Sequence, residues 1–413
     1  MSQNDVSATL ALLTPEAVRQ RCHEVFAAAE ANALDFFQLN IENFDSAVEL
    51  VLAEIAANYP GGEVPFHSRW RHFENCDRNF WHEASSSLLK DSKDEIARAQ
   101  IDLAVISVLL DAGAGPDWSF NDARSGLTFS RSEGLAIASL RLFESGVFSQ
   151  RGSDDPLRVD ASSLQALTPK ILASKFQVSP SNQLFGLEDR AKLLNRLGET
   201  LKKQKNIFEV EGAFRPGNLY DHLLQKQDNG TLDAREILIA ILQGMGEIWP
   251  DGCWINDIAI GDTGHYHAVK RSDITDGVVP FHKLSQWMSY SLIEPLQEAG
   301  LKVNNLDVLT GLAEYRNGGL FIDSKTISIK DSTQFEIVHD LKSPLVVEWR
   351  ALTVVLLDKL AEQIRLQTNT NSESMPLASI LQGGTWSAGR RIAHELRANG
   401  SPPLNLNSRG TIF

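Results

Sequence analysis

The segment that follows Ser343 and Pro344 constrains the fold of this chain more than any other. A serine before a proline is a good helix start, because the serine can accept from backbone N–H groups and proline suits the first helical position. From residue 351 to residue 357 only Thr353 is polar. A helix that is apolar on all sides must be covered on all sides. We therefore expect a central helix inside a compact, multi-helical body.

Hydrophobic periodicity predicts helices along most of the remaining chain. The predicted helices are 15–32, 46–58, 97–112, 132–145, 186–205, 232–248 and 280–299. Strand signals are few, and only 320–329 and 335–338 alternate enough to form a short hairpin or small sheet. Loops are predicted at 151–156, 250–263 and 367–375. We expect a mainly α fold with one domain over 1–413, subdivided into two lobes, about 1–175 and 176–413, around a central cleft.

The overall charge limits the classes of ligand that this chain can bind. With 413 residues and a net charge of −14, it lacks the positive surface that duplex DNA or an anionic membrane requires. A small anion in one local basic pocket remains compatible with this charge. Three separated cysteines without a CxxC pair indicate a reducing compartment, and neither a signal peptide nor a membrane-spanning run is recognisable. We therefore expect a cytoplasmic protein.

Two charges on the predicted central helix need partners from elsewhere in the chain. Glu348 and Arg350 are two residues apart, so they point to nearly opposite faces and cannot satisfy each other. A charge beside apolar packing is costly when it is unpaired. The sequence offers Arg316 as a partner for Glu348 and Glu314 as a partner for Arg350. Such a network is either structural or the wall of an active site.

The segment 313–323, AEYRNGGLFID, supplies those proposed partners. It gathers polar side chains and two glycines in six positions: Glu314, Tyr315, Arg316, Asn317, Gly318 and Gly319. The two glycines predict a turn with positive φ or a close approach to a ligand. A carboxylate, a guanidinium and a carboxamide beside a turn can form a small polar site. The alternative is a loop ion pair that caps two structural elements.

Three further segments carry candidate binding groups. In HSRWRHF, the residues Arg69, Trp70, Arg71 and His72 can bind a phosphate and stack on a planar group, unless the arginines pair with surface acids. In VPFHKLSQW, one helix carries His282, Lys283, Gln286 and Trp287, and the alternative is a solvated helix face. In 251–267, the carboxylates Asp257 and Asp262 precede His265 and His267. This HxH pattern alone is a weak metal signal, so we favour a carboxylate role for Asp262 or Asp257, with a simple turn as the alternative.

Several long stretches in one order resemble the uracil catabolism protein four family of fungi and bacteria. They span about residues 60 to 360 and read HSRWRHFE, SEGLAIASLRLFESGVFS, PLRVDASSL, FQVSPSNQLFGLEDRA, VPFHKLSQWMSYSLIEPLQEAG, LTGLAEYRNGGLFID and VVEWRALTVVLLDKL. A fainter similarity links LTGLAEYRNGG, PFHKLSQ and VEWRA to the queuosine-salvage nucleoside glycosylase. The second resemblance implies a fold like that of the helical DNA glycosylases, with Glu314 standing where that enzyme has an aspartate.

These resemblances imply a glycosidic reaction in uracil breakdown. The family is linked to a route that opens the uracil ring on ribose, so this protein is expected to release urea from ribosylurea or its 5′-phosphate. Cleaving the C1′–N bond develops oxocarbenium character, which a carboxylate stabilises directly or by activating water. The expected catalytic residues are Glu314, Asp262 and Glu348. The expected substrate-binding residues are Arg69, Trp70, Arg71, His72, His282, Lys283, Gln286, Trp287, Tyr315, Arg316, Asn317 and Arg350.

Two other functions compete with this expectation. One is an amidohydrolase that attacks the ureido group with a metal at Asp262, His265 and His267. The other is a non-catalytic protein that binds a nucleotide-like ligand. The favoured reaction requires no cofactor and no metal, and its partner is a small ribosyl substrate rather than nucleic acid or a membrane. The sequence leaves the oligomeric state open.

Overall fold

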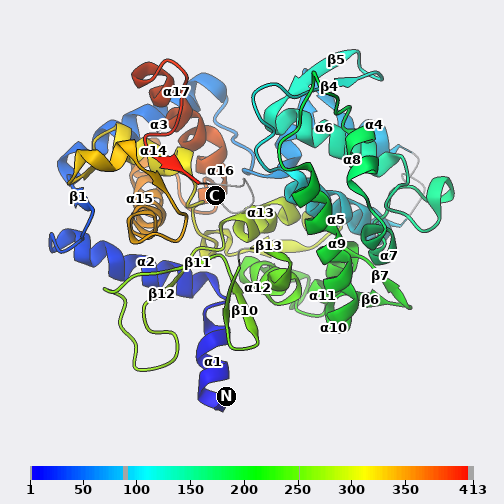
Figure 1. Ribbon diagram of the computed structural model, residues 1–413, viewed down its shortest axis with the longest axis horizontal. Coiled ribbons are helices and arrows are strands. Elements are labelled where there is room, and N and C mark those ends of the chain that lie inside the picture. The colour runs from blue at the N-terminus through cyan, green and yellow to red at the C-terminus, as the bar shows by residue number, and fades with distance from the viewer. Residues whose placement is uncertain (1, 87–91, 251, 408–413) are drawn as a thin grey trace.

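The computed structural model describes residues 2–86, 92–250 and 252–407 and shows a mainly helical protein (Figure 1). The α-helices are α1 (Gln3–Ala11), α2 (Pro15–Glu30), α3 (Phe44–Asn58), α4 (Phe80–Ser85), α5 (Lys93–Leu110), α6 (Arg131–Glu144), α7 (Ala161–Gln165), α8 (Pro169–Lys175), α9 (Leu187–Lys203), α10 (Lys205–Phe208), α11 (Leu219–Leu224), α12 (Ala234–Met245), α13 (Lys283–Glu298), α14 (Tyr315–Asp323), α15 (Pro344–Thr368), α16 (Leu377–Ile380) and α17 (Trp386–Leu396). The prediction of a mainly α fold is confirmed.

Helix α15 is the central helix that the sequence predicts. It begins at Pro344 after Ser343, and every residue from 345 to 357 is buried. Helices α2, α3, α14 and α16 pack against it, which provides the all-round cover that its apolar surface requires. The position of Glu348 and Arg350 is therefore fixed by a rigid, fully packed element.

The helices form two groups with α13 between them (Figure 1). One group contains α2, α3, α14, α15 and α17, so the first helices of the chain lie with the last ones. The other group contains α5, α6, α9 and α11, from the middle of the chain. Because α2 packs against α15, the first group extends across the boundary near residue 175 that we predicted for two lobes. Helix α13 packs against α5 and α12.

The strands are short and pair two by two. The antiparallel pairs are β1 (Phe37–Leu39) with β14 (Ile327–Ile329), β2 (Glu74–Asn75) with β3 (Arg78–Asn79), β4 (Ser119–Asp122) with β5 (Leu127–Ser130), β6 (Glu209–Val210) with β7 (Ala213–Phe214), β9 (Cys253–Ile255) with β10 (Ile258–Gly261), and β11 (Thr263–His265) with β12 (Val278–Pro280). The parallel pairs are β8 (Thr231–Asp233) with β13 (Lys302–Asn304) and β15 (Val338–His339) with β16 (Asn405–Leu406).

The prediction of one hairpin from 320–329 and 335–338 is wrong, although small sheets do form. Residues 320–323 are the last turn of α14, because the Glu314 side chain caps the start of a helix there. Strand β14 pairs with β1 instead, and β15 pairs with β16. The loop predicted at 250–263 contains the β9–β10 hairpin.

The predicted turn at Gly318 and Gly319 is also wrong, because both glycines lie inside α14. Neither has a positive φ. A Cβ atom at Gly318 would lie 2.6 Å from the Trp349 Nε1 atom and 2.8 Å from the Thr353 hydroxyl oxygen. Gly318 is therefore needed for the close packing of α14 on α15 and not for a turn. Among the described residues, no helix combines the length and apolar character that crossing a membrane requires.

Candidate active site

The first turn of α13 is fixed by Asp262, which follows strand β10. Strands β11 and β12 pair antiparallel and return the chain to Asp262. The backbone carbonyl of Asp262 accepts from the N–H groups of Phe281 and His282 at 3.0 and 3.1 Å. Its carboxylate accepts from the backbone N–H of Lys283 at 3.0 Å. His282 itself is buried and its ring Nε2 lies 2.9 Å from the carbonyl oxygen of Leu12.

Asp262 also forms a two-pronged ion pair with Arg350. The Arg350 Nη1 and Nη2 atoms each lie 2.7 Å from one carboxylate oxygen. The Arg350 guanidinium also packs over the Phe281 ring and donates to the carbonyl of Ala313. Burial raises the pKa of Asp262, but Arg350 and the Lys283 N–H lower it by a larger amount. The pKa of Asp262 therefore lies below its usual value. Arg350 is therefore bound to Asp262, where the sequence suggested Glu314.

Glu314 caps the N-terminus of α14 and lies in a different environment. Its carboxylate accepts from the backbone N–H groups of Arg316 at 2.8 Å and Asn317 at 2.5 Å. The residue is 6% exposed, and burial raises the pKa of its carboxyl group, with the Lys283 charge acting in the opposite direction. A carboxylate has about four acceptor positions, so two backbone donors leave part of it available. Glu314 is thus a buried acid with free acceptor capacity.

Glu348 is fully buried, and the surrounding backbone uses its acceptor capacity. It accepts from the backbone N–H groups of Asp35, Phe36 and Phe37 and from the Tyr266 hydroxyl at 2.5 Å. Burial raises the pKa of its carboxyl group. These bonds anchor the segment before β1 to α15. Its partners are therefore backbone groups and a tyrosine, whereas the sequence suggested Arg316.

The HSRWRHF segment forms the short helix η2 (Arg69–His72) against α13. Arg69 is fully buried and donates to the hydroxyls of Ser107 and Ser132. Trp70 is buried and donates to the carbonyl of Ser291. The guanidinium of Arg71 binds the carboxylates of Glu294 and Glu74. Arg71 therefore pairs with acidic side chains, as the structural alternative for this segment predicts.

An aromatic cluster forms around Trp287 of α13. The ring of His67 stacks on Trp287 with centroids 6.2 Å apart, and His72 approaches edge-on at 6.1 Å. The Arg69 guanidinium lies 5.7 Å from the Trp287 ring centre. Burial lowers the pKa of His67 and, more strongly, of His72, which favours neutral rings. The cluster can therefore cover a planar, uncharged group.

Many of the candidate binding residues carry a buried polar atom without a hydrogen-bond partner among the described residues. In native proteins such atoms are rare, because each one costs about 1–3 kcal/mol. The atoms are Arg69 Nη2, Arg71 Nε, His72 Nδ1, His282 Nδ1, Gln286 Nε2, Trp287 Nε1, Arg316 Nε and Asn317 Oδ1. Together they account for eight of the fifteen side-chain atoms of this kind, so unsatisfied polar groups concentrate in this region.

The charges of the region converge on Lys283, the first residue of α13. Among the residues that the structure describes, none forms an ion pair or hydrogen bond with its Nζ atom. Burial lowers the pKa of Lys283, and the charges that act on it are those of Glu314, Arg350, Asp111 and Asp262. The pKa of Tyr315 is raised, mainly by burial and also by the charges of Glu314 and Asp111. Contacts of Lys283 with Asp262, of Trp287 with Arg69 and of Gln286 with Thr310 hold the flanking segments against α13.

Other partners fix the loop that presents Glu314. Gln286 on α13 accepts from the backbone N–H of Thr310 at 3.2 Å. Asn317 donates to the carbonyl of Leu312 at 3.1 Å. Arg316 donates to the carbonyl of Gly400 at 2.7 Å, and its guanidinium packs over the Tyr315 ring. Both sides of the segment before α14 are thereby held in place.

The residues proposed for a metal do not gather around one point. Asp262 is bound to Arg350, and the exposed ring of His267 lies 3.5 Å from a carboxylate oxygen of Asp35. His265 is exposed on β11. Among the described residues, no group of three histidine, cysteine or acidic side chains is arranged to hold a metal ion.

Asp111 belongs to this region and was not predicted from the sequence. It follows the last residue of α5, and its carboxylate pairs with Arg69 and accepts from Ser132. The sequence carried one signal for Asp111. An acid at the negative end of a helix is unfavourable, so its presence there indicates a role other than stabilising the helix. His67 was also missed as an individual residue, and it lies within 3.0 Å of the Gln382 side chain.

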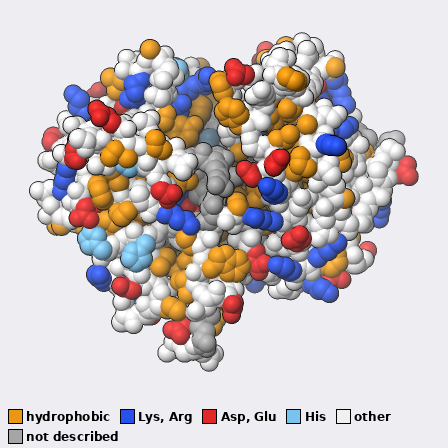
Figure 2. Space-filling model, in the orientation of Figure 1, with side chains coloured by type: hydrophobic (Ala, Val, Ile, Leu, Met, Phe, Trp, Pro, Cys, Tyr) orange, Lys and Arg blue, Asp and Glu red, His pale blue; other side chains and the backbone are white. Residues whose placement is uncertain are grey.

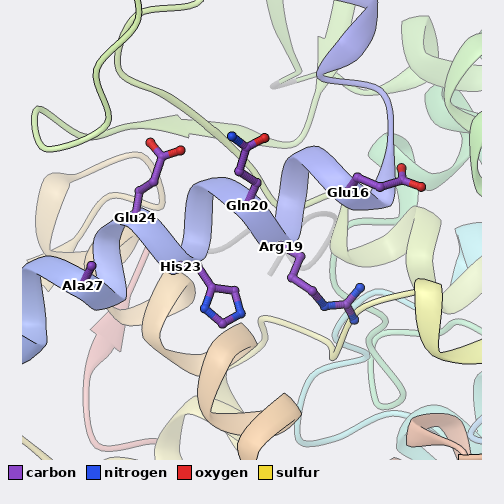
Figure 3. Close-up of a pocket in the computed structure, with 6 residues that line it drawn as sticks. All are labelled: Glu16, Arg19, Gln20, His23, Glu24 and Ala27. Atoms are coloured by element: carbon purple, nitrogen blue, oxygen red, sulfur yellow. The ribbon is translucent and has the colours of Figure 1, made fainter.

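A surface hollow on α2 lies away from this region (Figure 3). Its lining residues all come from that one helix: Glu16, Arg19, Gln20, His23, Glu24 and Ala27. Arg19 already binds Asp358 and three backbone carbonyls. The space-filling view shows a separate notch between the two groups of helices, with hydrophobic side chains on its walls (Figure 2). Convergence of polar groups, rather than surface shape, therefore defines the candidate site.

The fold and the site define a mainly helical protein with a buried polar region. Comparison with known sequences identifies its family. The family described as "Protein of unknown function (DUF1688)" matches residues 11–413, and the chain belongs to it. The protein is 37% identical to Uracil catabolism protein 4 of Lachancea kluyveri, over 96% of this chain and 97% of that protein. It is 35% identical to Protein urg3 of Schizosaccharomyces pombe, over 97% and 98%. The family resemblance predicted from the sequence is confirmed.

Proposed function

We propose that this protein is a hydrolase of uracil catabolism that cleaves the N-glycosidic bond of ribosylurea and releases urea. The placement in uracil catabolism is supported by the name of the Lachancea kluyveri relative, which matches nearly the whole chain. The observation that carries the reaction is the buried carboxylate of Glu314, which accepts from only two backbone N–H groups and keeps acceptor capacity. The similarity to the queuosine-salvage nucleoside glycosylase, and the glycosidic reaction it implies, belong to this proposal.

Glu314 is the proposed general base among the three candidate carboxylates. Asp262 is committed to Arg350, and Glu348 is committed to backbone groups and Tyr266. Glu314 keeps acceptor capacity, and a carboxyl pKa raised towards neutrality makes a more effective base. It takes a proton from the water that attacks C1′, while the C1′–N bond breaks.

Lys283 is the proposed proton donor to the departing nitrogen. Urea is a poor leaving group, so it must receive a proton as the bond breaks. A lysine whose pKa is lowered by burial is a stronger acid than an exposed lysine. The products are then ribose and urea, and one water molecule is consumed.

The Trp287 cluster is proposed to hold the urea group. Urea is planar and uncharged, which suits an indole flanked by neutral imidazoles. The unpartnered Trp287 Nε1–H can donate to the ureido oxygen. The arginines support a 5′-phosphate less well, because Arg71 is bound to two acids and Arg69 to Asp111. We therefore favour unphosphorylated ribosylurea as the substrate.

Product analysis tests this function directly. Purified protein is incubated with ribosylurea and, separately, with its 5′-phosphate, and urea, ribose and ammonia are quantified. Urea and ribose in equal amounts, with ribosylurea as the better substrate, are expected. Ammonia with no urea would indicate the amidohydrolase, and binding without turnover by folded protein would indicate a non-catalytic ligand-binding protein. Either result would overturn the proposal.

A further inference from the structure

Asp111 occupies a position that helix energetics alone does not favour. It follows Leu110 at the C-terminal end of α5, where the partial negative charge of the helix repels a carboxylate. The carbonyls around it are covered by Arg190, which donates to Leu110, Ala112 and Gly113. The helix end is therefore already satisfied without an acid at this position, and Asp111 has another role.

The carboxylate of Asp111 is held in a defined orientation. The Ser132 hydroxyl lies 2.6 and 2.5 Å from its two oxygens, and Arg69 Nη1 lies 3.1 Å from one of them. Ser132 is in the first turn of α6, whose positive end offsets part of the cost. Arg69 is fully buried and fixed by Ser107, whereas the Asp111 side chain is 10% exposed. The support is rigid and the acceptor atoms remain reachable.

Asp111 is linked to the Trp287 cluster of α13 through Arg69, whose guanidinium pairs with Asp111 and lies 5.7 Å from the Trp287 ring centre. The charge of Asp111 acts on Lys283 of α13 and on Tyr315 of α14. Glu314 acts on both of these residues as well. Asp111 therefore approaches the Trp287 cluster of α13 from the end of α5. A ribosyl group attached to a urea group held at Trp287 would lie beside Arg69 and Asp111.

We propose that Asp111 determines sugar specificity by accepting hydrogen bonds from the vicinal hydroxyls of the ribosyl group. This inference rests on the proposed ribosidase function. An ionised carboxylate only accepts hydrogen bonds, and Ser132 and Arg69 use only part of its four acceptor positions. A ribose diol supplies two donors, whereas a phosphate would be repelled. Hydrogen bonds to the 2-hydroxyl group also strengthen in glycosidase transition states.

The test compares kcat/KM for ribosylurea with kcat/KM for its 2-deoxy and 3-deoxy analogues. Wild type, Asp111→Asn and the control Asp117→Asn, at an exposed position, are measured in parallel. Asp111→Asn is expected to lower kcat/KM for ribosylurea about 10- to 100-fold, the range for a hydrogen bond to a charged group. At least one deoxy analogue should lose less than about threefold, because it lacks the hydroxyl that Asp111 binds. Asp117→Asn should change neither value.

The ratio between substrates separates this proposal from a structural role. The folded fraction of a variant cancels in that ratio, and the intrinsic reactivities of the substrates cancel when the ratio is compared with that of wild type. Ser132→Ala, which keeps the carboxylate but removes its orienting hydroxyl, should shift the ratio in the same direction by a smaller factor. Equal losses on all three substrates would make Asp111 only the counter-ion of Arg69 and overturn the inference, while leaving the ribosidase function intact. Absence of urea release by wild type would overturn the function itself.

Discussion

At the scale of single residues, three candidate carboxylates of similar appearance in the sequence have different surroundings. Asp262 has a guanidinium partner, Glu348 has backbone partners, and Glu314 has two backbone donors and a nearby lysine. Sequence spacing identified all three as candidates but could not rank them. Their partners come from segments up to several hundred residues away, and only the fold brings those segments together.

The opposite pKa shifts of Glu314 and Lys283 predict a bell-shaped pH dependence of kcat/KM. Glu314 must be ionised, and burial raises its pKa above the ordinary value of 4.5, so activity rises with pH through a midpoint above 4.5. Lys283 must be protonated, and burial lowers its pKa below 10.5, so activity falls through a midpoint below 10.5. Initial rates of urea release across pH 4 to 11 check both limbs.

The basic limb has its own control. Lys283→Arg keeps the positive charge but cannot release a proton in this range, because arginine stays protonated. We expect this variant to lose at least about 100-fold in kcat, within the range of general acid catalysis, together with the basic limb. An unchanged profile in Lys283→Arg would contradict the assignment of Lys283 as proton donor.

At the scale of elements, α14 shows why local patterns predicted the wrong structure. The strand prediction for 320–329 followed its alternation, but the Glu314 cap and the packing on α15 favour a helix up to Asp323. The glycines were read as turn formers, although Gly318 serves close packing against Trp349 and Thr353. Alternation and glycine content are local signals, whereas helix packing is a tertiary effect. Long amphipathic helices such as α9 and α13 were predicted well because periodicity itself encodes them.

Gly318→Ala is expected to destabilise the protein. The added methyl group would lie 2.6 Å from Trp349 Nε1, so α14 and α15 would have to separate. Overpacking of this kind typically costs about 1–3 kcal/mol. Gly61→Ala is the matched control, because nothing lies within 4 Å of a Cβ atom at that position. Thermal unfolding of both variants measures the difference, and equal melting temperatures would contradict the packing role.

Glu348→Gln is expected to lower stability without removing activity. A glutamine amide would direct N–H donors at the N–H groups of residues 35–37 and leave buried groups unpaired. We expect a loss of about 1–3 kcal/mol or more in the free energy of unfolding. Guanidinium chloride unfolding measures this loss, and kcat per folded molecule should stay within about threefold of wild type. A large fall in kcat with unchanged stability would return Glu348 to the catalytic candidates.

At the scale of the whole molecule, the Asp262–Arg350 pair joins the β10–β11 connection, the start of α13 and the central helix α15. The mainly helical fold and the central helix were predictable, since composition and periodicity determine them. The joining of the chain's two ends into one group of helices was not. That arrangement depends on contacts such as those of α2 with α15, which no local pattern encodes.

Asp262→Asn is expected to destabilise the whole molecule by about 3–5 kcal/mol, because it leaves the buried Arg350 without its charged partner. The folded pKa of Asp262 is lowered below the ordinary value of 3.8, mainly by Arg350. Its contribution to stability is therefore present above pH 3.8 and is lost as pH falls through the folded pKa. Melting temperatures of wild type and Asp262→Asn at several pH values should differ most above pH 4 and converge in stronger acid. A constant difference would contradict this linkage.

The central claim is that Glu314 is the catalytic carboxylate of a ribosylurea N-ribosidase. The most direct test is urea release from ribosylurea by wild type and Glu314→Gln, with Glu336→Gln, at an exposed position, as the matched control. Both variants must first be shown to be folded by their thermal unfolding, since loss of the α14 cap costs only about 0.5–2 kcal/mol. We predict turnover by wild type and Glu336→Gln and a loss of at least about 100-fold in kcat for folded Glu314→Gln. Undiminished urea release by Glu314→Gln would contradict the claim.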